Sequence, residues 1–279
     1  MATRRDYDAE AVAAANSVIL ELTRLLGEYR QHIVLVGGWV PELLLPSAEP
    51  KHVGSLDVDL ALDHRELSEA GYATIRELLL GRGYEQDPQR QPFIFHRRVI
   101  VGERQIVVEV DLLAGEYEGT DRRHRTQKVQ DVRPRKARGC DLALDMAVEV
   151  ELKGTLPGGA KDTATIRVAS IIPFVVMKGM ALVDRLKEKD AYDIYFCVKQ
   201  YPGGADGLAD EFRPHITHGL VREGLRNIAG KFESPRGYGP TAVADFLEIT
   251  DVEERERICR DAHEQINALL HGLEIEGAG

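Results

Sequence analysis

The chain has 279 residues, a formal net charge of −10, 43% hydrophobic residues and 29% charged residues. This composition is ordinary for a folded globular protein and argues against a disordered or fibrous chain. No apolar run reaches the roughly 18 residues of a membrane span, and the N-terminus has no apolar signal-peptide core. Three cysteines (Cys140, Cys197 and Cys259) show neither metal-site nor disulfide spacing. We therefore expect no membrane association, reduced thiols and a cytoplasmic location.

The charge is unevenly distributed along the chain. Residues 122–138 hold eight Lys or Arg and one Asp, so the remainder has 28 basic and 45 acidic residues and a net charge of −17. An acidic protein is a poor partner for nucleic acid, because phosphate binding requires Lys and Arg. The basic segment could bind RNA locally, or it could be a solvated loop that pairs with the acidic remainder.

Apolar patterns predict alternating helices and strands in the first half of the chain. We expect strands that end in, or lie beside, glycine turns such as Gly37-Gly38, Gly102-Glu103 and Gly158-Gly159. The predicted helices are 9–30, 39–45 and 65–82, and the predicted strands are 32–36, 56–62, 93–101, 105–113, 147–152 and 163–168.

From about Ala169 the pattern is helical to the C-terminus, with breaks at 202–204, near Pro214 and at 235–240. The expected fold is α+β, with a mixed β-sheet in the N-terminal half and a helical C-terminal half. We place the domains at 1–168 and 169–279.

The first chemical signal joins the Gly37-Gly38 turn to two aspartates. Asp57 and Asp59 alternate along a predicted strand, so their carboxylates point to the same side. Such a pair can bind Mg²⁺, which prefers carboxylate and phosphate oxygens. A glycine turn lets backbone N–H groups approach phosphates, and Ser55 adds a hydroxyl beside the same loop. The alternative is that both aspartates lie on the solvated face of an edge strand.

Asp111 is the second signal, because it interrupts a strongly apolar strand. A buried carboxylate needs a cation, a hydrogen-bond partner or a proton. If this strand pairs with 56–62, Asp111 joins Asp57 and Asp59, with Glu109 on the same face. A third carboxylate there could bind metal or accept a proton from an attacking hydroxyl. The alternative is a strand end with solvated acids.

The third signal lies in the helical half. Lys178 falls within an apolar segment, where it either extends to solvent or faces an anion. Asp190 and Asp193 are three residues apart and share a helix face. Lys187 and Lys189 could pair with these carboxylates or with phosphate, or the segment could be a solvated helix start.

Gly37-Gly38, Gly54-Ser55, Asp57-Val58-Asp59 and Asp111 together resemble the polymerase β-type nucleotidyltransferase superfamily. The segment from Lys178 to Tyr195, with Lys187, Lys189, Asp190 and Asp193, is similar to the AbiEii/AbiGii-type toxin branch of type IV toxin–antitoxin systems. The resemblance covers about residues 30–200. Two departures are a long gap between Gly38 and Asp57 and the presence of His52-Val53-Gly54 where the family often has a basic residue.

The resemblance implies transfer of a nucleoside monophosphate from an NTP to an acceptor, with Mg²⁺ or Mn²⁺. It implies that Asp57, Asp59 and Asp111 bind the metal, with Lys178, Asp190 and Asp193 as further catalytic residues. Nucleotide contacts are then expected from Gly37, Gly38, Ser55, Lys187 and Lys189.

The acceptor stays open at this point. The toxin branch implies RNA, notably tRNA, with the segment 122–138 as its binding surface and an antitoxin protein as a partner. An aminoglycoside-like cation is the second alternative, because it would suit the acidic surface. The third is a catalytically silent binding module, although all three aspartates are present.

Overall fold

The structure is a computed structural model that describes residues 3–67, 71–86, 91–121 and 123–275. The chain forms two compact units. The sheet unit comprises Tyr7–Val40 and Gly54–Ser170, and the helical unit comprises Met1–Asp6, Pro41–Val53 and Ile171–Gly279. The division into functional domains at 168/169 stays a prediction.

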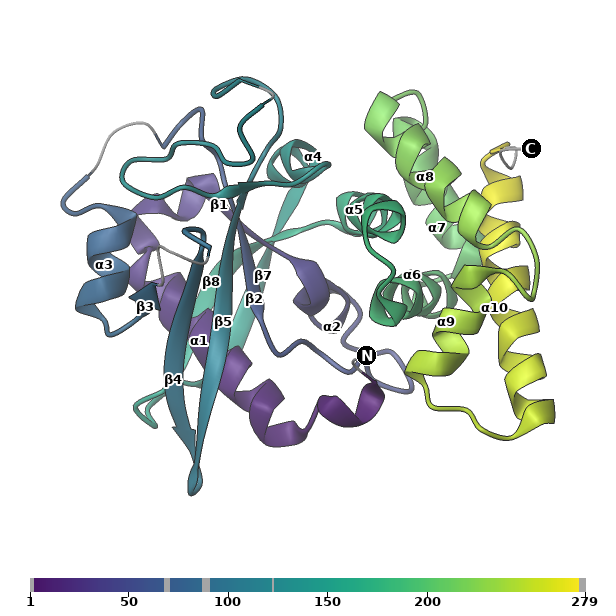
Figure 1. Ribbon diagram of the computed structural model, residues 1–279, viewed down its shortest axis with the longest axis horizontal. Coiled ribbons are helices and arrows are strands. Elements are labelled where there is room, and N and C mark those ends of the chain that lie inside the picture. Colours follow the sequence, from purple (N-terminus) through teal and green to yellow (C-terminus); the bar gives the residue numbers. More distant parts are fainter. Residues whose placement is uncertain (1–2, 68–70, 87–90, 122, 276–279) are drawn as a thin grey trace. The chain divides into compact units, whose positions relative to one another are not determined.

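The sheet unit contains a mixed sheet with the strand path β3-β4-β5-β2-β1-β8-β7, and β6 pairs with β5 outside this path (Figure 1). The pairs β1–β8, β2–β5 and β5–β6 are parallel, and the other pairs are antiparallel. This arrangement confirms the predicted α+β fold with a mixed sheet. The strands are β1 (Ile33–Val36), β2 (Val58–Leu62), β3 (Glu85–Gln86), β4 (Ile94–Val101), β5 (Arg104–Ala114), β6 (Arg135–Lys136), β7 (Ala147–Thr155) and β8 (Lys161–Ala169).

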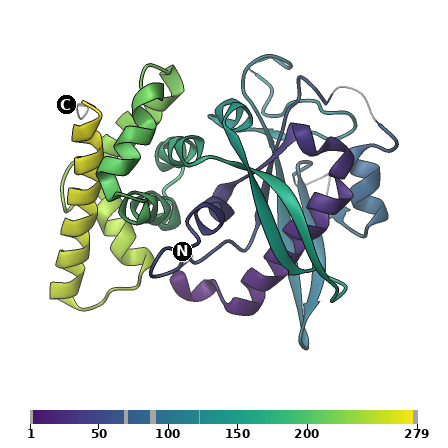
Figure 2. The ribbon, with the colours of Figure 1, turned by 180° about the vertical axis from the view of Figure 1, so that it is seen from behind.

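Helix α1 (Ala9–Leu25) crosses one face of this sheet and packs against both of its hairpins, β4–β5 and β7–β8 (Figure 2). Its N-terminus is capped by the Asp8 side chain, which accepts a hydrogen bond from Ala11 N at 2.9 Å. Its residues Ile19 and Leu22 are buried, as the helical spacing predicts. The predicted helix was too long, because Gly27–His32 forms 3₁₀ turns.

Of the predicted helix 65–82, residues 68–70 lie outside the described part of the chain. Among the described residues the prediction was correct only in its last part, since α3 runs over Ile75–Gly81. The reason is a capping box at Thr74. The Thr74 hydroxyl accepts from Glu77 N, and the Glu77 carboxylate accepts from Thr74 N at 3.0 Å. The short elements β3, β6 and α4 (Cys140–Asp145) were not predicted, because two to six residues carry too little periodicity.

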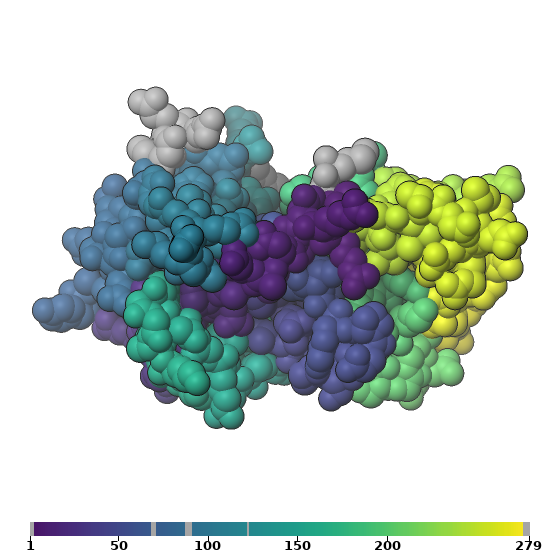
Figure 3. All heavy atoms as spheres, turned by 90° about the horizontal axis from the view of Figure 1, so that it is seen from below, coloured from purple at the N-terminus to yellow at the C-terminus, as the bar shows by residue number. Residues whose placement is uncertain are grey.

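The helical unit confirms the helical C-terminal half. Helices α5 and α8 approach each other closely at two glycines. A side chain at Gly179 would overlap the backbone of Gly224, so glycine permits this approach. Figure 3 shows α10 in yellow at the surface of this unit. The helices are α2 (Val40–Leu44, which starts in the sheet unit), α5 (Ile171–Asp184), α6 (Glu188–Gln200), α7 (Gly204–Phe212), α8 (Gly219–Lys231), α9 (Tyr238–Phe246) and α10 (Val252–Gly272). Among the described residues, no helix combines the length and apolar character needed to cross a bilayer.

Thr74→Ala should lower the free energy of unfolding by about 1 kcal/mol, because an N-cap hydroxyl is lost. The same hydroxyl donates to Asp131 Oδ2 at 2.6 Å, so the loop at Asp131 loosens too. Urea denaturation measures the change. Thr74→Ser keeps the hydroxyl and serves as the control; equal stability of Thr74→Ala and the wild type would contradict the role of the cap.

Candidate functional site

The glycine turn after β1 lies directly against Asp59. Gly37 has φ +73°, and a Cβ at this position would overlap the Asp59 carboxylate. Antiparallel pairing places Val36 opposite Asp59, which brings the turn to this point of the sheet. Glycine is therefore required twice at Gly37, once for the backbone angle and once for the close approach.

Asp59 and Asp111 lie opposite each other on neighbouring strands. Strand β2 pairs with β5 in parallel, which the sequence left as a condition, and the register pairs these two residues directly. Asp57 lies one residue before β2, and its negative charge is near enough to raise the pKa of Asp111. The sheet thus brings Asp57, Asp59 and Asp111 to one region, called here the aspartate site.

Two contacts fix Asp57 at this site. The Ser55 hydroxyl, which is buried, donates to Asp57 Oδ1. The Trp39 indole Nε1 donates to the Asp57 carbonyl oxygen at 3.0 Å. Trp39 itself follows Gly38 in the turn, so the glycine turn and the start of β2 are tied together. Three residues predicted to bind nucleotide therefore lie beside Asp57 and Asp59: Gly37, Gly38 and Ser55.

Asp111 is the most buried of the three carboxylates, with 9% of its surface exposed. Burial raises its pKa to about 6, the Arg135 charge opposes this rise, and Glu109 and Asp57 add to it. Arg135 Nη2 donates to Asp111 Oδ2 at 2.8 Å. The other oxygen, Oδ1, is buried and has no hydrogen-bond partner in the described part of the chain. An unsatisfied carboxylate oxygen is costly, which marks Oδ1 as a place for a cation or a donor group.

The contacts of the three aspartates decide how well the site fits a divalent cation. No three His, Cys, Asp or Glu side chains within the described ranges are grouped closely enough to hold a metal ion. Asp57 contacts Ser55, and Asp111 contacts Arg135. Mg²⁺, however, commonly uses one or two carboxylates together with substrate phosphates. The opposed Asp59 and Asp111 and the unpartnered Oδ1 fit that requirement, while the assignment of all three aspartates as ligands stays a prediction.

The predicted lysine and aspartates of the helical half form a buried charge cluster in the helical unit. Lys178 Nζ lies 2.7 Å from Asp190 Oδ1 and 2.7 Å from Asp193 Oδ2. These two ion pairs join α5 to α6, and within α6 Lys189 Nζ lies 2.9 Å from Asp193 Oδ1. The expected shared face of Asp190 and Asp193 is confirmed. Lys187, by contrast, is exposed at the N-terminal end of α6.

Burial and pairing compete in this cluster, and pairing prevails. Burial disfavours the charged form of Lys178, but Asp190 and Asp193 outweigh it and raise its pKa. Burial would raise the pKa of Asp193, yet Lys178 and Lys189 hold it well below its usual range. These groups are therefore fixed as ions at neutral pH.

His52 was not among the predicted site residues. His52 Nε2 lies 3.0 Å from Asp193 Oδ1, and its ring packs against the rings of Tyr192 and Phe196 at 5.7 and 4.8 Å. Burial lowers the pKa of His52 to about 4, against the opposing effect of Asp193. His52 is thus neutral at pH 7, and Nε2 donates to the ionised Asp193. No spacing in the sequence pointed to this residue.

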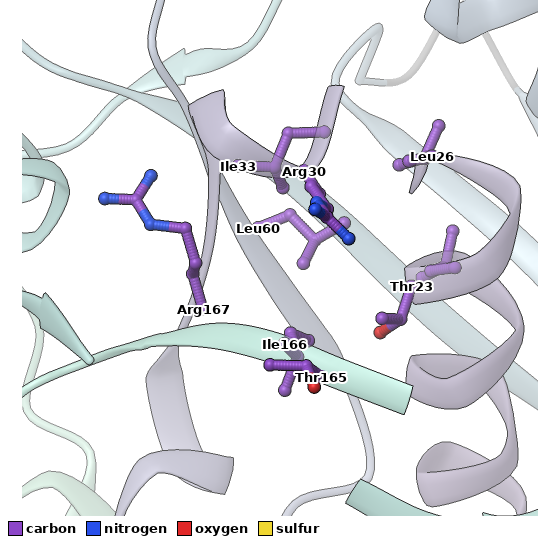
Figure 4. Close-up of a pocket in the computed structure, with 9 residues that line it drawn as sticks. Thr23, Leu26, Arg30, Ile33, Leu60, Thr165, Ile166 and Arg167 are labelled. Atoms are coloured by element: carbon purple, nitrogen blue, oxygen red, sulfur yellow. The ribbon is translucent and has the colours of Figure 1, made fainter. Parts of the chain in front are cut away.

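A small pocket lies on the other face of the sheet. Its lining includes Leu60, whose side chain points opposite to that of Asp59 because neighbours on a strand alternate. Figure 4 shows Thr23 and Leu26 on the helical side of the pocket and Leu60 and Ile166 on its strand side. This pocket is therefore separate from the aspartate site.

No protein-family model and no curated protein matches the chain. Two solved structures from Helicobacter pylori show some similarity. JHP933 has 14% sequence identity and a TM-score of 0.44, over 96% of this chain and 94% of that chain. A structure provisionally described as a nucleotidyltransferase has 12% identity and a TM-score of 0.47, over 96% of this chain and 98% of that chain. Likeness at this level does not indicate function.

Replacing Gly37 should test the close approach to Asp59. Gly37→Ala should lower the free energy of unfolding by about 1–3 kcal/mol more than Gly159→Ala, because the new Cβ displaces the carboxylate. Gly159 is the matched control, since it has φ +88° and open space around it. Chemical denaturation of both variants gives the comparison, and equal losses would argue against the contact.

The neutral state of His52 predicts a pH effect on stability. Its pKa is about 4 when folded and 6.5 ordinarily, so the unfolded chain binds more protons between these values. The contribution is complete above pH 6.5 and is lost as the pH falls to about 4, on the order of 3 kcal/mol in all.

His52→Gln should therefore be less sensitive than the wild type to this pH decrease, when thermal or urea unfolding is followed across the range. His218→Gln changes an exposed histidine and should keep the wild-type profile. Identical profiles for His52→Gln and the wild type would show that His52 is not held neutral.

Proposed function

We propose that the protein is a nucleotidyltransferase that moves a nucleoside monophosphate from an NTP to an acceptor hydroxyl and releases pyrophosphate, with Mg²⁺ or Mn²⁺. The main support is the arrangement of Gly37, Asp59 and Asp111: a glycine turn, a carboxylate on it, and a second carboxylate with an unpartnered buried oxygen. A turn for phosphates beside a pair of hard oxygen ligands suits a metal-bound triphosphate.

Each residue of the aspartate site has a proposed role. Asp59 and Asp111, with Asp57 beside them, would hold the divalent cation, which would neutralise charge on the phosphates when bound. The backbone N–H groups of Gly37-Gly38 would bind phosphate oxygens. The Ser55 hydroxyl is a further proposed nucleotide contact, and it would have to turn from Asp57 Oδ1 to a phosphate oxygen. Asp111 Oδ1 would accept the proton of the attacking hydroxyl, while Arg135 keeps the carboxylate oriented through Oδ2.

The buried charge cluster has a proposed role in the same reaction. Lys178 makes ion pairs with two carboxylates, Asp190 and Asp193, so it is strongly positioned. The proposed catalytic roles of these three residues rest on their resemblance to the toxin branch. Lys187 and Lys189 are the proposed nucleotide contacts, and the exposed Lys187 is the more accessible of the two.

The proposed acceptor is RNA, notably tRNA, and the proposed biological role is that of a toxin controlled by an antitoxin protein. The resemblance to the type IV toxin branch supports both. The acidic remainder of the chain would instead suit a cationic small acceptor, and a catalytically silent module would bind NTP without turnover.

Labelled NTPs test the proposal directly. Incubation of the protein with Mg²⁺, each labelled NTP and total tRNA should label the RNA. Asp59→Asn should lower this rate by about 100-fold or more, because metal stabilisation is worth several kcal/mol. Asp145→Asn changes an exposed carboxylate and is the matched control.

The remaining outcomes separate the alternatives. Label on an aminoglycoside-like amine instead of RNA would replace the acceptor. NTP binding with no transfer to either would favour the silent module. Expression that is toxic for the wild type and harmless for Asp59→Asn would support the toxin role, and equal toxicity would contradict it.

A further inference from the structure

Within the segment 122–138, the described residues 123–138 form a hairpin that is folded onto the sheet unit, seen in Figure 1 among the teal loops beside α4. We call residues 123–136 the basic hairpin. Gln127 N donates to Pro134 O at 2.9 Å, and Val129 and Val132 bond each other's backbones. Both valines are buried, and the C-terminal arm ends in β6, which pairs with β5. The hairpin is therefore held by a core and by the sheet.

Gln127 also fixes the loop before the hairpin. Its side chain is fully buried, and its Nε2 donates to Gly115 O at 2.9 Å and to Glu118 O at 3.0 Å. Its Oε1 accepts from Thr120 N at 2.9 Å. Residues 115–120 and the hairpin consequently form one supported surface.

The basic side chains of this segment fall into two groups. The first group acts inside the protein: Arg135 pairs with Asp111, Lys136 donates to Thr120 O at 2.8 Å, and Arg138 pairs with Glu116 at 2.8 Å. Arg122, which the sequence analysis included, lies outside the described residues. The second group is exposed and comprises Arg123, Arg125, Lys128 and Arg133, whose side chains have no acidic partner in the described part of the chain.

The exposed basic side chains of this second group outnumber the exposed acidic side chains near them. Glu118 and Asp121 are exposed on the same surface. Asp131 is also exposed, and it keeps its charge while it accepts from the Thr74 hydroxyl at 2.6 Å. Four exposed cations thus lie near three exposed acids, and Lys136, which donates to backbone oxygens, adds a further positive charge. The hairpin is therefore locally positive on an otherwise acidic chain.

The surface suits a polyanion better than a protein. The exposed large apolar side chains of the described residues include none from 123–136, whereas protein interfaces are centred on apolar and aromatic side chains. Tyr117, in the supported loop, is the exception beside the hairpin, with 44% of its surface exposed. Its backbone is held by His64 Nε2 at 3.0 Å from Tyr117 O. An exposed aromatic ring next to cations is the combination that binds unpaired nucleotides.

We propose that Arg123, Arg125, Lys128 and Arg133 bind the phosphates of an unpaired RNA segment and that Tyr117 stacks on one of its bases. This inference rests on the proposed function and identifies the surface that holds its acceptor. It excludes Arg135 from RNA binding, because that side chain serves Asp111.

Binding of a fluorescent single-stranded RNA, without NTP or Mg²⁺, tests this surface by anisotropy. The test variant is R123Q/R125Q/K128Q/R133Q. The matched control is R222Q/R226Q/R236Q/R260Q, which removes the same charge from exposed arginines of the helical unit. Circular dichroism confirms that both variants are folded.

The salt dependence gives the expected result. Between about 50 and 200 mM salt, each lost phosphate contact lowers the slope of log K against log salt by about 0.7, or about 3 for the test variant. The control should keep the wild-type slope. Tyr117→Ala should weaken binding of single-stranded RNA by about tenfold and leave duplex RNA nearly unchanged.

Three outcomes would overturn the proposal: equal slopes for test variant and wild type, equal losses for test and control variants, or equal effects of Tyr117→Ala on single-stranded and duplex RNA. A hairpin that binds an acidic protein and no RNA would also overturn it. Wild-type RNA binding together with no NTP-dependent labelling would contradict the proposed function alone.

Discussion

The in-register pairing of β2 with β5 determines the aspartate site. It places Asp59 beside Asp111 in the middle of the sheet, where water is largely excluded from Asp111. A buried carboxylate is unfavourable unless other groups compensate its charge. Arg135 compensates one oxygen through β6, and the other oxygen is left unsatisfied within the described chain. The surrounding turn at Gly37 follows from the same constraint, since only glycine leaves room for Asp59.

The helical unit stabilises its buried carboxylates in another way. Asp190 and Asp193 are almost completely buried, but they are paired with Lys178, Arg185 and Lys189. His52 completes the shell of Asp193 as a neutral donor. Removing one member of such a cluster leaves a buried charge without its partner, so the members stabilise one another. The cluster is saturated, whereas the aspartate site retains an unsatisfied oxygen, and this difference makes the aspartate site the better candidate for chemistry.

The basic segment shows how one sequence feature can serve two purposes. In the sequence it is a continuous run of positive charge, but its side chains separate according to where the backbone turns them. Arg135 faces the sheet and balances Asp111, while Arg125 and Lys128 face solvent. The net charge of −10 therefore says little about partners, because position decides which charges a partner can reach.

The sequence alone indicated the α+β architecture, the long strands and the aspartates that share a face. These depend on local periodicity, and alternation along Asp57, Val58 and Asp59 is such a signal. It also indicated the common helix face of Asp190 and Asp193. Only the tertiary structure revealed His52, because its partner is 141 residues away in the chain. The same holds for the pairing of Arg135 with Asp111, which requires the short strand β6. Contacts between distant segments depend on register and packing, and a local pattern contains no information about either.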